Sequence, residues 1–134
     1  MIAIQNLTKS YGEGSAAVRA LNGVDVTVFP GEILMLMGPS GSGKTTLLSI
    51  MGCILQATSG SVKVFDQEIV GLPEKKLPAV RLKHFGFVFQ GFNLFPALTA
   101  RENVEIGLNL KGIHGSSARK AATELLERVG LAEK

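Results

Sequence analysis

The segment from Gly38 to Thr46, which reads Gly-Pro-Ser-Gly-Ser-Gly-Lys-Thr-Thr, most constrains how this chain can fold. It fits the pattern G-x-x-x-x-G-K-[ST], which forms a loop around phosphate groups. Its glycines let successive backbone N–H groups turn inward toward phosphate oxygens. Lys44 supplies a compact positive charge for the β- and γ-phosphates, and the Thr45 hydroxyl suits Mg²⁺, which prefers hard oxygen ligands. The segment therefore predicts a site for a nucleoside triphosphate with magnesium.

The residues on either side of this loop agree with that prediction. Ile33–Met37 is a short apolar run, which is typical of a strand buried on both faces of a parallel sheet. Residues 46–51 contain no proline and have a pattern compatible with a helix. The order of strand, glycine loop and helix places a helix N-terminus, with its positive dipole end, at the phosphates. We therefore predict an α/β fold of the P-loop NTPase class.

The residues before the loop predict an antiparallel sheet. Residues 2–7 partly alternate between apolar and polar, and residues 18–21 and 24–28 continue as strands joined by a hairpin turn at Asn22-Gly23. The intervening residues 9–15 are predicted to form an exposed loop. This loop contains Tyr11, the only tyrosine. An exposed aromatic ring there either stacks on a purine base or covers a sheet edge.

The residues after the phosphate loop predict alternating strands and helices. Thr99 can cap a helix, with Glu102 completing a capping box, and Gly130 is well placed to end the last helix. The aromatic residues Phe92 and Phe95 fall in a predicted exposed loop. The predicted order is a strand over 61–65, a helix over 72–83, a strand over 85–89, a loop over 91–99, and helices beginning at Ala100 and near Ser116.

Length and composition indicate one globular domain in a reducing compartment. The chain has 134 residues, of which 46% are hydrophobic, and a mild net charge of +3. The lone Cys53 excludes an intrachain disulfide and is expected to pack in the core. No apolar run approaches the roughly 18 residues that a membrane span needs, and the N-terminus lacks the features of a secretory signal. We therefore expect a cytoplasmic location.

Two other function classes fit the residues less well. Aromatic residues between Phe85 and Phe95 lie near Arg81 and Lys83, a mixture found in binders of single-stranded nucleic acid. However, the alternation of the phenylalanines at 85, 87 and 89 suits the core of a sheet, so we expect no nucleic-acid partner. A P-loop kinase or GTPase is disfavoured, because the chain has no Asn-Lys-x-Asp guanine reader and neither class accounts for Tyr11 together with Gln90.

The chain resembles the nucleotide-binding domain of ABC transporters over its whole length. The segment from Gly38 to Thr46 is similar to the family's Walker A loop, and Gln90 is similar to its Q-loop glutamine. Tyr11 resembles the family's aromatic residue that stacks on adenine, and Val18 an apolar neighbour of that site. The resemblance implies ATP and Mg²⁺ as ligands. The implied ATP contacts are Tyr11, Val18, Ser40, Gly41, Ser42, Gly43, Lys44, Thr45 and Thr46.

The same resemblance implies catalytic and coupling roles. Lys44 and Gln90 would be the catalytic residues, and Thr45 and Gln90 would hold the magnesium ion. Residues 87–104 and the Gly52-Cys53 pair look most like the macrolide-exporter and lipoprotein-releasing branch. This branch implies an ATPase subunit that acts as a homodimer on the inner face of the cell membrane. Its Gln90–Thr99 loop would dock on a transmembrane permease subunit.

Some of the family's motifs are absent from the 134 residues. The family holds magnesium and polarises water with a strand ending in Asp and then Glu, and it carries a Leu-Ser-Gly-Gly-Gln signature loop. Asp66 follows a possible strand, but Lys63 interrupts that run and Gln67 stands where Glu is required, so we predict a hairpin turn there. The chain therefore resembles the N-terminal portion of one ABC ATPase domain.

We accordingly expect residues 1–134 to form a single incomplete domain. Residues 1–30 would be mainly antiparallel sheet, residues 31–95 the P-loop core up to the Q-loop, and residues 96–134 the start of a helical subdomain. Phosphate binding would survive in part, whereas ATP hydrolysis by this chain alone would be severely impaired, since phosphoryl transfer depends on electrostatic positioning. The alternative is a nucleotide-binding fragment that does not hydrolyse ATP and acts as a binding module.

Overall fold

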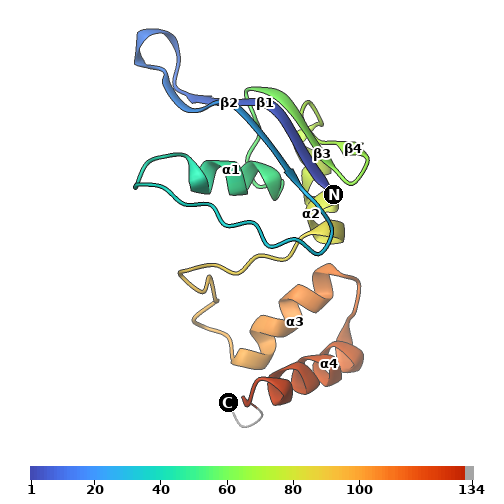
Figure 1. Cartoon of the computed structure of the whole chain (residues 1–134). Coiled ribbons are helices and arrows are strands. Elements are labelled where there is room, and N and C mark those ends of the chain that lie inside the picture. Colours follow the sequence, from blue (N-terminus) through green and yellow to red (C-terminus); the bar gives the residue numbers. More distant parts are fainter. Residues whose placement is uncertain (132–134) are drawn as a thin grey trace. The chain divides into compact units, whose positions relative to one another are not determined.

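A computed structural model describes residues 1–131 and divides the chain into two compact units, Met1–Phe85 and Gly86–Lys134 (Figure 1). Each unit has its own secondary structure and is described separately. Within the described residues, no helix is both long and apolar enough to cross a membrane.

The first unit is built on an antiparallel sheet with the strand order β2-β1-β3-β4 (Figure 1). This arrangement confirms the predicted antiparallel sheet at the N-terminus. Ile4 lies opposite Val26 on one neighbouring strand and opposite Val62 on the other, so apolar side chains share one face. The strands are β1 (Ile2–Tyr11), β2 (Val18–Val28), β3 (Ser59–Val64) and β4 (Gln67–Glu68).

A bulge at Asn6 sets which side chains of β1 enter the core. Asn6 has a φ of 47°, and its N–H donates to Oδ1 of Asp25 at 2.8 Å. The pairing register shifts between Ile4 and Leu7, and both of these side chains are buried. Strict alternation would have placed Ile4 and Asn6 on the same face. Because of the bulge, Leu7 rather than Asn6 enters the core beside Ile4.

Two sequence predictions about this hairpin are wrong. The Asn22-Gly23 pair does not form the turn; it lies inside β2, with Asn22 opposite Thr8. The connection instead runs through residues 12–17, which include the 3₁₀ turn η1 (Gly14–Ala16). Tyr11 is therefore not in a loop: it is the last residue of β1 and lies opposite Val18. Pairing along the whole of β1 favours the longer strand over the local turn signal.

The predicted helix after the phosphate loop is confirmed as α1 (Lys44–Met51), which packs beside the sheet (Figure 1). Cys53, just after α1, is 1% exposed, as predicted for a core residue, and burial raises the pKa of its thiol. Nη1 of Arg81 donates to the Cys53 carbonyl at 2.8 Å, which supplies a cation beside the C-terminal end of α1. The core comprises Ile4, Leu7, Leu21, Leu47, Ile50, Met51, Cys53, Val62, Val64, Ile69, Leu77 and Val80.

The β3–β4 hairpin confirms that Asp66 lies in a turn, between the ends of the two strands.

The Glu68 carboxylate forms hydrogen bonds that hold this hairpin together. Glu68 accepts hydrogen bonds from the Ser61 hydroxyl and from the backbone N–H groups of Val62 and Val70, the latter two at 2.9 Å. Partial burial disfavours the ionised carboxylate, but these hydrogen bonds outweigh it and lower the pKa of Glu68.

The helix predicted over 72–83 corresponds to a 3₁₀ turn, η2 (Glu74–Lys76), followed by α2 (Leu77–His84). The strands predicted at Ile33–Met37 and at residues 85–89 are not part of the described sheet. Ile33 is 94% exposed and Met35 is 73% exposed, so the expectation of burial on both faces is wrong for these residues. An apolar run indicates that a segment can be buried, but a strand also needs a neighbouring strand to form hydrogen bonds with its backbone. None of β1–β4 pairs with these two segments.

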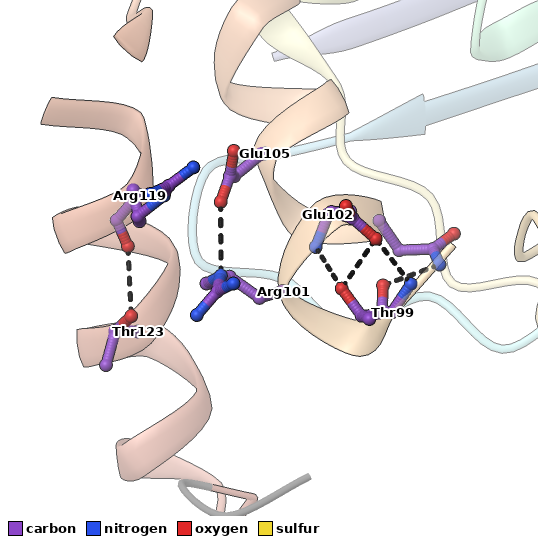
Figure 2. Close-up of polar contacts among 7 residues, drawn as sticks. Thr99, Arg101, Glu102, Glu105, Arg119 and Thr123 are labelled. Atoms are coloured by element: carbon purple, nitrogen blue, oxygen red, sulfur yellow. Dashed lines mark hydrogen bonds and ion pairs between the residues drawn. The ribbon is translucent and has the colours of Figure 1, made fainter. Parts of the chain in front are cut away.

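The second unit contains two helices that pack against each other, α3 (Ala100–Leu110) and α4 (Gly115–Arg128) (Figure 1). The predicted capping box is confirmed: the Glu102 N–H donates to Oγ1 of Thr99 at 3.3 Å, and the Thr99 N–H donates to the Glu102 carboxylate at 2.8 Å (Figure 2). Gly130 ends α4 as predicted, with a φ of 74° and its N–H bonded to the Glu127 carbonyl.

Replacing Glu68 with glutamine tests the carboxylate of the β3–β4 hairpin. The folded-state pKa lies below the ordinary 4.5, so the ionised form stabilises the fold above that pH, and this contribution is lost as the pH falls through the folded pKa. Glu68→Gln should therefore lower the free energy of unfolding at pH 7 by about 1 kcal/mol or less, once solvent screening is allowed for. The deficit should shrink below pH 4.5, as measured by urea unfolding followed by circular dichroism. A deficit that is independent of pH would contradict this role; Glu13→Gln controls for the loss of one charge.

Candidate functional site

The phosphate loop ends where α1 begins, and the first N–H groups of this helix have no side-chain cap. Gly43 is the N-cap residue, in a left-handed conformation with a φ of 88°. The first bond inside the helix runs from the Leu47 N–H to the Gly43 carbonyl at 2.8 Å. The N–H groups of residues 44–46 therefore precede the helical ladder and are oriented for an external acceptor. The donor set at this end of α1 fits an anion.

The loop lies directly against β2. A Cβ added at Gly43 would come within 2.5 Å of the Ala20 carbonyl oxygen and 2.9 Å of Leu21 Cδ2. Only a residue without a side chain fits between α1 and β2 at this distance. Ala20 and residues 40–46 line an open cavity of about 330 Å³, so the structure brings all seven predicted loop residues into one concave surface.

The Lys44 ammonium lies across the loop and bonds to it. Its Nζ donates to the carbonyl oxygens of Gly38 at 2.8 Å and of Pro39 at 2.7 Å, and it lies 3.2 Å from the Ser42 hydroxyl oxygen. These contacts match the three hydrogens of an ammonium group. The predicted phosphate-binding cation is thus positioned at the loop by the loop's own backbone.

Tyr11 and Val18 lie opposite each other at the open end of the β1–β2 hairpin. Their side chains are 44% and 66% exposed, which leaves apolar surface for a planar ligand. Val18 precedes Ala20 by two residues on β2, so the two residues are separated by about 7 Å along the strand, which has a pairing irregularity between Arg19 and Leu21. The hairpin therefore connects the predicted base site to the cavity at the phosphate loop.

Sequence reasoning missed two features of this region. The Lys9 ammonium lies 5.1 Å from the centroid of the Tyr11 ring, a cation–π contact. The sequence does not indicate this contact when residues 9–11 are predicted as a loop. Side chains two residues apart lie on a common face only in a strand. The backbone contact of Ala20 with Gly43 leaves no pattern in the sequence, since it depends on the packing of α1 against β2.

Thr45 and Gln90, the predicted magnesium ligands, lie in different units. Thr45 is exposed in the first turn of α1. Gln90 is exposed at the start of the second unit, in a turn before Gly91. Thr45 supplies a hydroxyl oxygen and Gln90 an amide oxygen, and both are hard ligands of the kind that magnesium takes. The residues fit the ion chemically, and the structure places each within its own unit.

Comparison with known proteins adds an independent observation. Residues 21–134 match the family described as "ABC transporter". This chain belongs to the ABC transporter family. The match covers the phosphate loop, α1 and both helices of the second unit, so it includes most of the features described above.

Relatives in the family include two kinds of ABC protein. The chain is 44% identical to the lipoprotein-releasing system ATP-binding protein LolD of Pseudoalteromonas translucida, matching 100% of this chain and 58% of that protein. It is 42% identical over 134 residues to the macrolide export ATP-binding/permease protein MacB of Marinobacter nauticus, matching all of this chain and 21% of that protein. This chain thus spans less than two thirds of the length of each of these relatives.

A solved structure supports the fold. The chain resembles the dimeric ATP-binding cassette MJ0796 bound to ADP and Pi, with a TM-score of 0.88 and 41% identity. The match covers 99% of this chain and 59% of that one. The predicted fold class, a P-loop ATPase cassette with an N-terminal antiparallel sheet, is therefore confirmed.

Alanine at Gly43 tests the contact between the loop and β2. Gly43→Ala should destabilise the fold by roughly 2–4 kcal/mol, because it combines a strained left-handed residue with a clash against the Ala20 carbonyl. Gly41→Ala is the matched control, with a φ of 78° but nothing within 4 Å of the added Cβ. It should cost only about 1 kcal/mol. Equal losses of unfolding free energy in the two variants would show that the contact with β2 does not matter.

Proposed function

We propose that this chain is the ATP-binding part of an ABC exporter ATPase, which couples ATP binding and hydrolysis to transport across a membrane. The observation that carries the proposal is the phosphate loop. It joins an uncapped helix N-terminus, the Lys44 ammonium and a concave surface in one place. Membership of the ABC transporter family supports ATP as the ligand.

Residues 40–46 hold the phosphates in this proposal. The N–H groups at the start of α1 donate to phosphate oxygens, and the Lys44 ammonium exchanges its contacts with the loop carbonyls for contacts with the β- and γ-phosphates. The Thr45 hydroxyl and the Gln90 amide are the residues that would hold a magnesium ion, which would neutralise charge on the phosphates. The contribution of this chain to phosphoryl transfer is therefore to position the phosphates and to stabilise charge on them.

Tyr11 and Val18 recognise the base. The exposed Tyr11 ring offers a stacking face for adenine, and Val18 extends the apolar surface beside it. Lys9 contacts the tyrosine ring and so restricts its orientation. Stacking of a base on an aromatic side chain is worth about 1–3 kcal/mol, enough to add to affinity but too little to replace the phosphate contacts.

The Gln90–Thr99 loop docks on a transmembrane permease subunit. The chain then lies on the inner face of the cell membrane, where it acts as one half of a homodimer. This loop exposes four large apolar side chains, with Phe92 80%, Leu94 64%, Phe95 56% and Leu98 37% exposed. Such residues gain free energy when a partner covers them. Loss of the permease after Phe92 and Phe95 are replaced tests this docking role.

Removal of the Lys44 ammonium tests phosphate binding. Lys44→Ala should abolish measurable binding of Mg·ATP, because each charge-assisted contact is worth about 2–3 kcal/mol and the ammonium serves more than one phosphate. Isothermal titration calorimetry on the purified chain measures the effect. Lys63→Ala, which removes an exposed lysine from β3, is the matched control and should bind normally. Tight ATP binding by Lys44→Ala would contradict the proposed site.

Variants of Tyr11 separate base recognition from phosphate recognition. Tyr11→Ala should weaken ATP binding about tenfold, whereas binding of inorganic triphosphate should not change, because stacking contributes only through the base. Tyr11→Phe keeps the ring and should retain ATP affinity. An equal loss for ATP and triphosphate in Tyr11→Ala would instead mean that the substitution disturbs the hairpin.

A further inference from the structure

The side chain of Asn103, in the first part of α3, is bonded to the loop that precedes the helix. Its Oδ1 accepts from the Phe95 N–H at 2.8 Å. Its Nδ2 lies within donating distance of the carbonyl oxygens of Phe95 at 3.2 Å, Leu98 at 3.1 Å and Thr99 at 3.0 Å. One amide group therefore uses both its acceptor and its donors to join the two ends of the turn over residues 95–99.

This turn has little else to hold it. All of residues 91–99 are exposed, so none of their side chains is anchored in a core. Within the turn the Leu98 N–H donates to the Phe95 carbonyl at 3.1 Å. Beyond it, the Thr99–Glu102 capping box secures only the last residue to α3 (Figure 2). Asn103 is the side chain that reaches back to Phe95, four residues before the cap.

A loop that is ordered before it meets its partner loses less conformational entropy on binding. Exposed apolar side chains such as Phe95 gain most when they already lie in the bound arrangement. Asn103 is half-buried, and it supplies this order through its hydrogen bonds to the loop backbone.

We propose that Asn103 is a positioning residue, which fixes the turn over residues 95–99 so that Phe95 is presented to the transmembrane permease subunit. This inference rests on the proposed docking role of the Gln90–Thr99 loop. It adds a residue outside that loop, on the following helix, whose effect on docking is transmitted by hydrogen bonds.

Asn103→Asp gives a sharp test because it keeps the shape of the side chain. The new oxygen in place of Nδ2 faces three carbonyl oxygens to which it cannot donate, while the acceptor for the Phe95 N–H remains. The acidic group lies near the N-terminus of α3, where the helix dipole favours negative charge. If Asn103 acted only through helix stability, this variant would be neutral or slightly stabilising.

Asn109→Asp is the matched control. It makes the same chemical change on the same helix, at an exposed position near the C-terminus of α3. There the helix dipole disfavours negative charge, so a role through helix stability alone predicts that Asn109→Asp is the more harmful variant. Positioning of the loop predicts the opposite order.

Two measurements on the complete natural protein distinguish loop positioning from helix stability as the role of Asn103. Amide hydrogen exchange over residues 92–99 should quicken roughly tenfold in Asn103→Asp but not in Asn109→Asp, with α4 unchanged in both. Co-purification of the protein from membranes, with the permease identified by mass spectrometry, should fall in Asn103→Asp and in the double variant Phe92→Ser with Phe95→Ser. Mg·ATP affinity should remain that of the wild type.

The failures are distinguishable. If the double phenylalanine variant retains the permease, the docking role itself is wrong, and the positioning role is overturned with it. If that variant loses the permease but Asn103→Asp retains it, docking stands and the inference about Asn103 is overturned. Unchanged exchange over residues 92–99 in Asn103→Asp would also overturn it.

Discussion

The close contact between Gly43 and β2 is the constraint on which the candidate site depends. Because Gly43 has no side chain, α1 begins against the Ala20 carbonyl, and the strand that carries Val18 also forms one wall of the phosphate cavity. The predicted base-binding residues and the predicted phosphate loop are thereby joined through one hairpin and the helix that packs against it. A larger residue at this position would separate them even if every ligand-contacting side chain were kept.

The sequence predicted the local structure of the phosphate loop, a glycine loop followed by α1, because its requirements are local. The glycines, Lys44 and Thr45 are adjacent in the chain, and their roles follow from backbone freedom, charge and oxygen chemistry without knowledge of distant residues. The Thr99–Glu102 capping box and the Gly130 helix end were predicted for the same reason. Each is decided within a few residues of one helix terminus.

The sequence predictions were wrong where contacts between residues far apart in the chain determine the local structure. The Asn22-Gly23 pair has the local preference for a turn, but pairing with β1 keeps both residues in a strand. The bulge at Asn6 depends on a carboxylate 19 residues away, Asp25, which no local pattern identifies. Ile33–Met37 has the composition of a buried strand, yet composition does not supply the neighbouring strand that burial requires. Asn103 was missed likewise, because its partners lie in an irregular loop.

The contacts of the Lys44 ammonium with Gly38 and Pro39 have a consequence for discrimination among solutes. The loop's own carbonyls already solvate the cation, so a neutral sugar or alcohol would only replace one set of uncharged acceptors with another. An oxyanion offers a stronger acceptor than a carbonyl and so gains from the exchange. In the proposed site this exchange favours charged ligands, so we expect the loop to discriminate against neutral metabolites that would fit its cavity by size.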